Sequence, residues 1–353
     1  MQTIRLDADP RGVVHLWLAR PDKHNALSAQ MIAELTEAAA RLGADPAVRV
    51  VVLATEGTSF CAGGDLGWMR DQMRGDARTR RAGAQALARM LQALNSLQKP
   101  LIARVQGNAF GGGVGLISVC DVAISVPQAR LGLTETRLGL IPATIGPYVL
   151  ARLGDARARR VFMSARLFGA DEAAALRLIA GLADPDTLDA AIGAEVAPYP
   201  ACAPGAVAAA KRLARRLGPP IGPEEIKASI DALVEIWEGA EAAEGIAAFF
   251  DRRPPNWSRC PAPIKEQAGS AAASLSPFLE YPNPALTTCF LDAGSAGGPL
   301  TKRRCRRGIE KTESRKRKIR NGRPGLMGCG NTLAACACLP AAGLRLALRR
   351  GIC

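Results

Sequence analysis

The sequence predicts an α/β fold built from stacked strand–strand–helix units. Two short apolar runs rich in β-branched residues, Val50–Ala54 and Leu101–Val105, are typical of strands buried on both faces. A glycine-rich turn follows each run, and sequence with helical spacing follows each turn. This alternation predicts helices packed outside the strands.

The segment before the first unit has its own turn and capping signals. Ile4–Leu6 and Val13–Leu18 predict two strands of a hairpin, separated by a cluster of turn-forming residues. Ser28 is a suitable N-cap for an amphipathic helix that runs to about Leu42, and Gly43 is its expected stop.

Helical spacing recurs through the following two hundred residues. One further strand is expected at Val122–Ser125, and the region from Pro200 to Phe250 is helical throughout. The other helices are expected at Arg78–Leu97, at about Gly113–Cys120, at Arg157–Ser164 and at Asp171–Ala180.

Two glycine turns carry the strongest chemical signal. They are residues 60–66 (Phe-Cys-Ala-Gly-Gly-Asp-Leu) and residues 110–113 (Phe-Gly-Gly-Gly). A backbone without Cβ atoms can turn its N–H groups toward a ligand. Two such turns that converge form an oxyanion hole, which stabilises negative charge on a reacting carbonyl oxygen.

The two turns and two further segments, residues 20–27 and 134–142, resemble the crotonase family of enoyl-CoA hydratases and isomerases. The further segments read Arg-Pro-Asp-Lys-His-Asn-Ala-Leu and Thr-Glu-Thr-Arg-Leu-Gly-Leu-Ile-Pro, and the resemblance runs from about Ile4 to Trp257. It implies an acyl-CoA thioester substrate.

The resemblance also implies a domain organisation. Residues 1–199 would form a crotonase-like spiral of ββα repeats, and residues 200–257 a C-terminal helical subdomain. In the family such helices build a homotrimer or a dimer of trimers. Residues 258–353 are expected to be an unpatterned basic tail.

Catalytic roles follow from the same resemblance. The N–H groups of Ala62 and Gly112 would form the oxyanion hole, and Glu135 would act as general base and proton donor. The family uses up to two glutamates, and Gly115 stands where the second is expected. Leucines around Glu135 would desolvate its carboxyl group and raise its pKa.

Coenzyme A binding is assigned to two segments. Lys23 would pair with a phosphate, and the backbone around Ala26 would meet the adenine. The backbone of Gly63, Gly64 and Asp65 would line the pantetheine and thioester end. No metal, flavin or nicotinamide cofactor is expected, because the glycines lack the dinucleotide-binding pattern and the chemistry is not redox.

Residues 111–121 and 140–149 most resemble bacterial 3-methylglutaconyl-CoA hydratases of leucine catabolism, and similar sequences occur in isohexenylglutaconyl-CoA hydratases of acyclic terpene degradation. Both substrates carry a second carboxylate, for which Arg137 is a candidate partner. Two alternatives stay open: an enoyl-CoA isomerase with one carboxylate, and a non-catalytic protein that binds CoA esters or polyanions.

Charge and cysteines divide at the same point of the chain. The formal net charge is +14, but residues from Arg259 onward hold 17 Lys and Arg against 5 Asp and Glu, whereas the preceding residues hold 29 against 27. A nucleic-acid partner is therefore not expected for the part that carries the motifs. Its three cysteines, Cys61, Cys120 and Cys202, favour a reducing compartment. With no apolar signal segment at the N-terminus, we expect a cytoplasmic location and no membrane contact.

The tail lacks sustained strand or helix periodicity and mixes Pro, Gly, Ser, Cys and Arg. Its cysteines lack Cys-x-x-Cys spacing, so a zinc site is not expected. The uncharged stretch 324–344 contains Asn331 and Pro340, so a membrane helix is not expected either. We interpret the change at Trp257–Cys260 as a frameshift or a missed stop codon.

Overall fold

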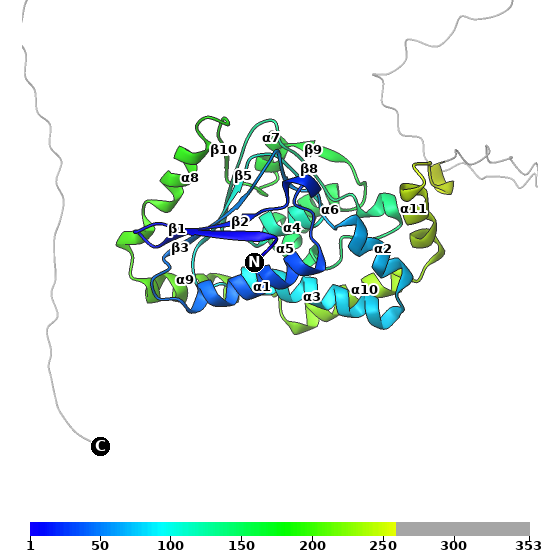
Figure 1. Cartoon of the computed structure of the whole chain (residues 1–353), viewed down its shortest axis with the longest axis horizontal. Helices are drawn as coiled ribbons and strands as arrows, with labels where there is room; N and C mark the ends of the chain where they lie inside the picture. The colour runs from blue at the N-terminus through cyan, green and yellow to red at the C-terminus, as the bar shows by residue number, and fades with distance from the viewer. Residues whose placement is uncertain (259–353) are drawn as a thin grey trace, which may run out of the picture. The chain divides into compact units, whose positions relative to one another are not determined.

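The computed structural model describes residues 1–258. Within this range the strands form two sheets, ordered β1-β2-β3-β5-β7-β10 and β4-β6-β8-β9. Figure 1 labels most of these strands and the helices around them. The first sheet contains β1 (Ile4–Ala8), β2 (Val13–Leu18), β3 (Val50–Thr55), β5 (Leu101–Val105), β7 (Val122–Ser125) and β10 (Gly181–Leu182). The second contains β4 (Ser59–Cys61), β6 (Asn108–Phe110), β8 (Arg130–Gly132) and β9 (Leu167–Gly169).

Successive repeats give one strand to each sheet. Strands β3, β5 and β7 pair in parallel in the first sheet, and β4, β6 and β8, which follow them in the chain, pair in parallel in the second. The hairpin β1–β2 is antiparallel and joins the first sheet beside β3. The predicted spiral of ββα repeats is confirmed.

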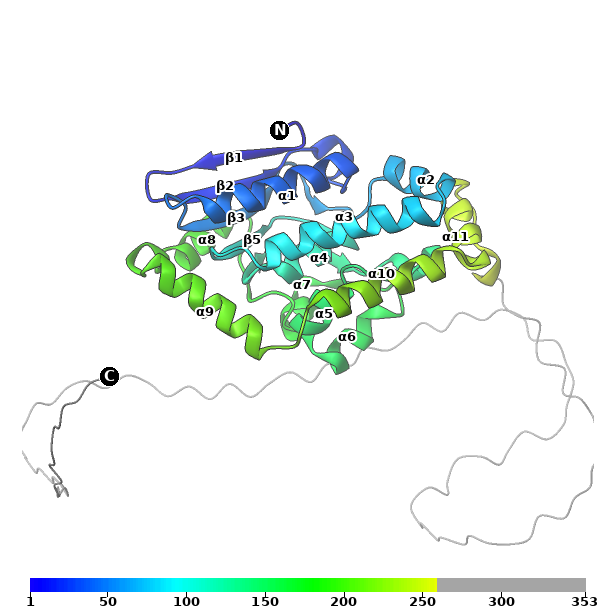
Figure 2. The ribbon, with the colours of Figure 1, turned by 90° about the horizontal axis from the view of Figure 1, so that it is seen from below.

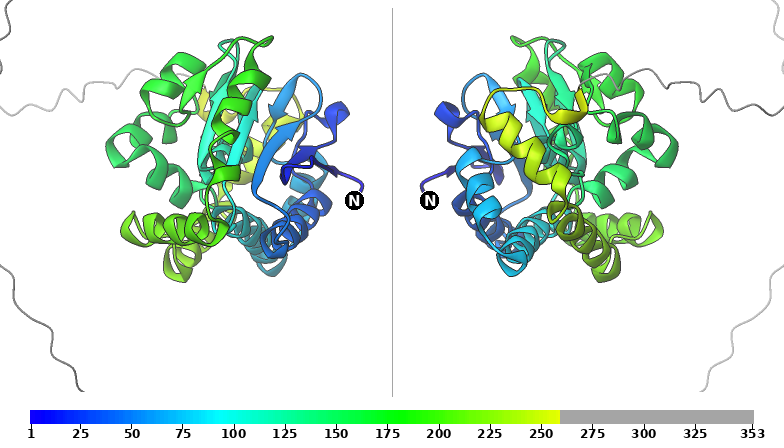
Figure 3. Two further views of the ribbon diagram at one scale, coloured as in Figure 1. Left: turned by 90° about the vertical axis from the view of Figure 1, so that its left-hand side faces the viewer. Right: turned by 90° about the vertical axis from the view of Figure 1, so that its right-hand side faces the viewer.

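Helices lie on more than one side of the strands (Figure 3), and α8 contacts β5 and β7. Figure 2 shows α1, α3 and α10 lying side by side, and α3 contacts both of the others. The helices are α1 (Ala29–Ala44), α2 (Leu66–Arg74), α3 (Ala77–Asn95), α4 (Gly112–Val119), α5 (Gly146–Leu153), α6 (Asp155–Phe162), α7 (Ala170–Ala175), α8 (Leu188–Val196), α9 (Pro204–Leu217), α10 (Pro223–Trp237) and α11 (Ala240–Phe250), with a 3₁₀ turn η2 at Glu135–Leu138.

The core lies between the first sheet and α1, α3 and α4. Every residue of β3 is buried, as its continuous apolar sequence predicts for a strand covered on both faces. Met31 and Leu35 of α1 and Leu91 of α3 are fully buried in the same core cluster as β3. Burying each such side chain contributes roughly 1.5–3 kcal/mol, so this layer holds the spiral together.

Two predicted helix ends are wrong. Helix α1 begins after Ser28, whose hydroxyl accepts the Met31 N–H, but it continues through Gly43 to Ala44. Gly43 does not adopt the left-handed conformation that ends many helices. Helix α7 stops at Ala175, well before the expected residue 180, and Arg177 just beyond it has φ +65°. Helix α2 is not among the helices that the sequence predicts.

Helices α9 to α11 confirm the helical prediction for residues 200–250, and the division at residue 199 stays a prediction. An ion-pair cluster ties α9 to the spiral. Lys211 Nζ lies 2.6 Å from Asp121 Oδ2, and Arg215 Nη2 lies 3.3 Å from Asp121 Oδ1. Asp121 Oδ2 also accepts the N–H of Leu101 at the start of β5.

No helix in residues 1–258 is long and apolar enough to cross a membrane. The predicted tail from residue 259 lies outside the described residues.

The Asp121→Asn variant should be less stable by about 2–3 kcal/mol, because it leaves the largely buried Lys211 ammonium without its counter-charge. Burial already lowers the pKa of Lys211. Urea unfolding measures the loss. Asp155→Asn, which removes an exposed ion pair with Arg159, is the control and should be neutral. Equal effects of the two variants would contradict the assignment.

Candidate active site

Three functional segments begin at one edge of the second sheet. Strands β4, β6 and β8 run parallel and lie next to one another, so their carboxyl ends meet. Residues 62–64 follow β4, residues 111–112 follow β6, and Glu135 lies three residues after β8. The parallel register therefore brings together segments that are about fifty and twenty residues apart in the chain.

The two glycine turns are in direct contact. A methyl group added to Gly63 would lie 3.7 Å from the amide nitrogen of Gly112 and 3.1 Å from the carbonyl oxygen of Phe110. Gly63 has φ +92° and Gly111 has φ +48°, conformations that side chains disfavour. The sequence prediction that these turns converge is confirmed.

One predicted oxyanion donor is wrong. The N–H of Ala62 donates to the carbonyl of His24 at 3.0 Å, so it is already used. The N–H of Gly64 has no acceptor within residues 1–258. Gly112 is the first residue of α4, and its N–H has no helical acceptor. The pair available to a carbonyl oxygen is therefore Gly64 and Gly112, at the positive end of α4.

Glu135 lies against these turns. Its Oε1 would be 2.9 Å from a methyl group on Gly111, so that glycine makes room for the carboxyl group. Its Oε2 is buried and lacks a hydrogen-bond partner in the described part of the chain. Burial raises the pKa of Glu135 to about 7. A carboxyl group with this pKa can both accept and donate a proton near neutral pH.

A cavity of about 460 Å³ surrounds this centre. Gly63, Gly64, Gly112 and Glu135 line it, and Glu135 is the only carboxylate among its lining residues in the described range. The rest of the wall is largely apolar. It includes Leu138 and Leu140, which belong to the leucines that the sequence places around Glu135. The other apolar wall residues come from helices that the sequence does not assign to the site, and they include Leu66, Trp68, Met69, Leu87, Leu233, Trp237 and Phe249.

Residues 20–27 lie beside the first glycine turn. Leu27 N–H donates to the Gly63 carbonyl at 2.8 Å, and Asp65 N–H donates to the Leu27 carbonyl at 3.0 Å. Lys23 is exposed, with its Nζ 3.8 Å from an Asp22 carboxylate oxygen, and neither it nor Ala26 lines the cavity. Their contacts with coenzyme A stay predictions.

Asp65 has a structural role that the sequence prediction missed. Its Oδ1 caps α2 by accepting the N–H groups of Gly67 and Trp68. Its Oδ2 accepts from Arg20 at 2.9 Å, and Arg20 also donates to the Ala26 carbonyl. Because its carboxylate and its N–H are both engaged, and Asp65 does not line the cavity, the structure does not support its assignment to the thioester end.

Arg137 and Cys61 are two further side chains that the sequence singles out, and their surroundings in the structure differ. Arg137 lines the cavity and is exposed, and its guanidinium has no hydrogen-bond or ion-pair partner in residues 1–258. Cys61 is fully buried, and burial raises the pKa of its thiol to about 12, so it stays protonated and is not a nucleophile. No cluster of three potential metal ligands occurs in the described range.

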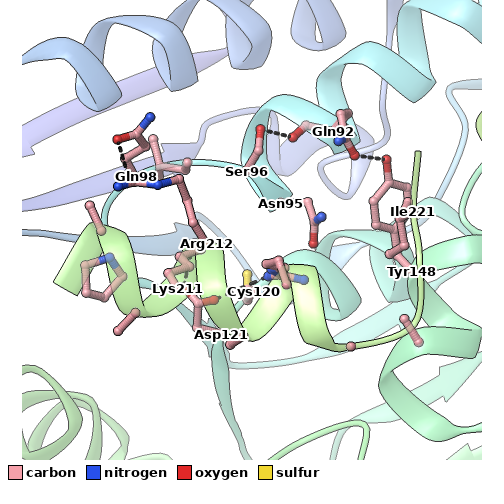
Figure 4. Close-up of a pocket in the computed structure, with 18 of the residues that line it drawn as sticks. Gln92, Asn95, Ser96, Gln98, Cys120, Asp121, Tyr148, Lys211, Arg212 and Ile221 are labelled. Atoms are coloured by element: carbon pink, nitrogen blue, oxygen red, sulfur yellow. Dashed lines mark hydrogen bonds and ion pairs between the residues drawn. The ribbon is translucent and has the colours of Figure 1, made fainter. Parts of the chain in front are cut away.

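A second cavity, of about 720 Å³, lies between α3, α4, α5 and α9 (Figure 4). None of the glycine-turn residues and no part of Glu135 lines it. Its carboxylate, Asp121, is paired with Lys211 and Arg215, and Tyr148 donates to Gln92 at 3.0 Å. Because the one carboxylate among its described lining residues is neutralised by two cations, we place the reacting centre in the smaller cavity.

A spiral of ββα repeats whose glycine turns converge beside a buried carboxyl group is the arrangement that the crotonase resemblance predicts. The model of the enoyl-CoA hydratase/isomerase family matches residues 8–260. The chain therefore belongs to the enoyl-CoA hydratase/isomerase family.

Individual relatives support this membership. A crotonyl-CoA hydratase of Syntrophomonas wolfei is 30% identical over 252 residues, which is 69% of this chain and 93% of that protein. The crystal structure of an enoyl-CoA hydratase from Shewanella pealeana has a TM-score of 0.60 at 35% identity, covering 72% of this chain and 96% of that one. AtuE of Pseudomonas aeruginosa gives 0.59 at 35% identity, covering 73% and 100%.

A Gly112→Pro variant tests the donor at position 112. Proline is tolerated at the first position of a helix but lacks the N–H, so kcat should fall about 10²–10³-fold. Gly112→Ala is the matched control, since it keeps the N–H while placing a similar Cβ against Leu27. Steady-state kinetics on an enoyl-CoA compares them. Equal activities would show that this N–H does not bind the developing oxyanion.

A Glu135→Gln variant should lose activity and gain stability in a pH-dependent way. The pKa of Glu135 is raised from 4.5 to about 7, so the folded protein holds a proton that the unfolded chain releases between these values. Stability contributed by this group therefore falls as pH rises through that window. The variant should be more stable than the wild type by about 3 kcal/mol at pH 8 and by nothing at pH 4. Thermal unfolding at both pH values measures this, and a pH-independent difference would refute it.

Proposed function

We propose that this protein hydrates the 2,3 double bond of an enoyl-CoA thioester. The observation that carries the proposal is the Glu135 carboxyl group lying against Gly111 in a largely apolar cavity, which is also lined by two residues whose N–H groups have no acceptor in residues 1–258. The donors provide a place for a thioester oxygen, and the carboxyl group is near enough to move protons at the adjacent carbons.

The proposed reaction uses each group in a defined role. The thioester oxygen accepts hydrogen bonds from Gly64 and Gly112, and negative charge develops there as water adds to the β-carbon. Ionised Glu135 takes a proton from that water, and the α-carbon of the resulting enolate then receives a proton from Glu135. The apolar wall excludes other water and strengthens the hydrogen bonds to the oxyanion. The proposed reaction uses no metal and no redox cofactor. Coenzyme A takes part only as a portion of the thioester substrate.

An enoyl-CoA isomerase is the second candidate. The observation that favours it is the single carboxylate among the described residues that line the cavity. One acid–base group is sufficient to remove a proton from one carbon and return it to another. The two reactions differ in their products, because only hydration adds the mass of one water.

We further propose a substrate with a second carboxylate, 3-methylglutaconyl-CoA, with isohexenylglutaconyl-CoA as the alternative. The support is Arg137, a cation that lines the cavity without a partner in residues 1–258. A guanidinium forms strong paired hydrogen bonds with a carboxylate. The place in leucine catabolism is part of the same proposal.

Other parts of the proposal concern binding and assembly. Lys23 and the Ala26 backbone remain our candidates for the coenzyme A phosphate and adenine. A homotrimer or a dimer of trimers is consistent with α9, which exposes Leu213 and Leu217 by 57% and 77%. A cytoplasmic location remains the expectation.

The Arg137→Met variant tests the substrate. With 3-methylglutaconyl-CoA its kcat/KM should fall about 10–100-fold, since one charged hydrogen-bond pair is lost. With crotonyl-CoA, which has no second carboxylate, it should change little. Products are followed by mass, and Glu135→Gln is the inactive control. Equal losses on both substrates would reject the carboxylate role, and an isomerised product without added water would favour the isomerase.

A further inference from the structure

Position 115 is a buried glycine on the helix that carries the oxyanion donor. Gly115 lies three residues after Gly112 on α4, so both are on one side of that helix. A methyl group added to Gly115 would lie 2.4 Å from Cγ2 and 3.0 Å from Cβ of Ile145. Ile145 therefore fills the volume that any side chain at position 115 would need.

Ile145 is also part of the cavity wall. It is only 2% exposed, yet it lines the same cavity as Glu135. Its carbonyl accepts the N–H groups of Tyr148 and Val149, each at 3.1 Å, in the first turn of α5. A β-branched side chain has few alternative rotamers, so the wall is stiff at this point.

Other wall residues are freer to move. Leu66 and Phe249 are each 47% exposed, and they come from α2 and α11. An exposed side chain can change rotamer to admit a larger ligand, whereas one packed against buried backbone cannot. Ile145 therefore belongs to the buried and less adaptable part of the wall, as does Leu27, and it is the wall residue that fills the space beside Gly115.

We propose that Ile145 is a specificity-determining residue, which closes position 115 and limits the size of the acyl group that fits beside Glu135. This inference rests on the proposed function and deepens it. It also accounts for the single carboxylate, because no glutamate fits at position 115 while Ile145 occupies that space.

Binding of unreactive saturated CoA thioesters tests the size limit. Isothermal titration compares butyryl-CoA with isovaleryl-CoA and octanoyl-CoA in the wild type and in Ile145→Ala. The preference for the larger acyl groups over butyryl should rise about tenfold in the variant, as expected for a gain or loss of one or two methylene contacts. Ile117→Ala is the matched control, because Ile117 is fully buried on α4 but does not line the cavity. An unchanged preference in Ile145→Ala would overturn the proposal.

A thermodynamic cycle tests the packing directly. Gly115→Ala alone should lower Tm by more than about 5 °C, although alanine is the better helix former. In the Ile145→Ala background the same change should cost nothing or raise Tm, because the opposing side chain is gone. The same cost in both backgrounds would refute the contact.

These readouts separate the inference from the proposed function. Neither titration nor unfolding needs turnover. If the wild type converts no enoyl-CoA while Ile145→Ala shifts the acyl preference, the proposed function fails and the role of Ile145 stands. If the wild type hydrates its substrate while the preference and the thermodynamic cycle show no effect of Ile145, only this inference fails.

Discussion

The site depends on the parallel register of β4, β6 and β8. Because these three short strands end at the same edge, the turns that follow them meet there. The contact between Gly63 and Gly111–Gly112 then leaves two N–H groups facing one cavity, with Glu135 beside them. The first sheet and its helices hold this register by burying β3, β5 and β7 in the core.

The same arrangement makes the site costly to fold. Glu135 is held among apolar residues with one oxygen buried and unpartnered, and its pKa is raised as a result. Glycines at 63 and 111 adopt conformations with positive φ without strain, but the chain loses more conformational entropy on folding at a glycine than at any other residue. Contacts of α3, α4 and η2 with their neighbours offset these costs, and α11 packs closely enough on η2 that Gly245 has no room for a Cβ beside Leu138.

Because the cavity wall is largely apolar, Glu135 is the one carboxyl group available for acid–base catalysis among the described residues that line it. Ile145 occupies the space beside Gly115, and Asp65, the carboxylate next to the first glycine turn, is used to cap α2 and to bind Arg20. Glu135 is thus the only acid with a free oxygen among the cavity residues of the described range. Arg137, which has no side-chain partner among residues 1–258, is the complementary charge at the same cavity.

Sequence alone predicted β1, β2, β3, β5 and β7 of the first sheet, the two glycine turns, Glu135 and the family resemblance, because these depend on local patterns of apolar residues and on short motifs. It did not predict β4, β6, β8 and β9 of the second sheet, because strands of three residues are too short to show such a pattern. Helix ends such as that of α1 at Ala44 were less certain, since Gly43 permits a stop without requiring one. Only the tertiary structure decided which N–H of the first turn is free. His24 occupies the Ala62 donor through a contact 38 residues away in the chain, which leaves Gly64. It also decided the wall, because Ile145, Trp237 and Phe249 come from separate helical segments that meet only in the folded protein.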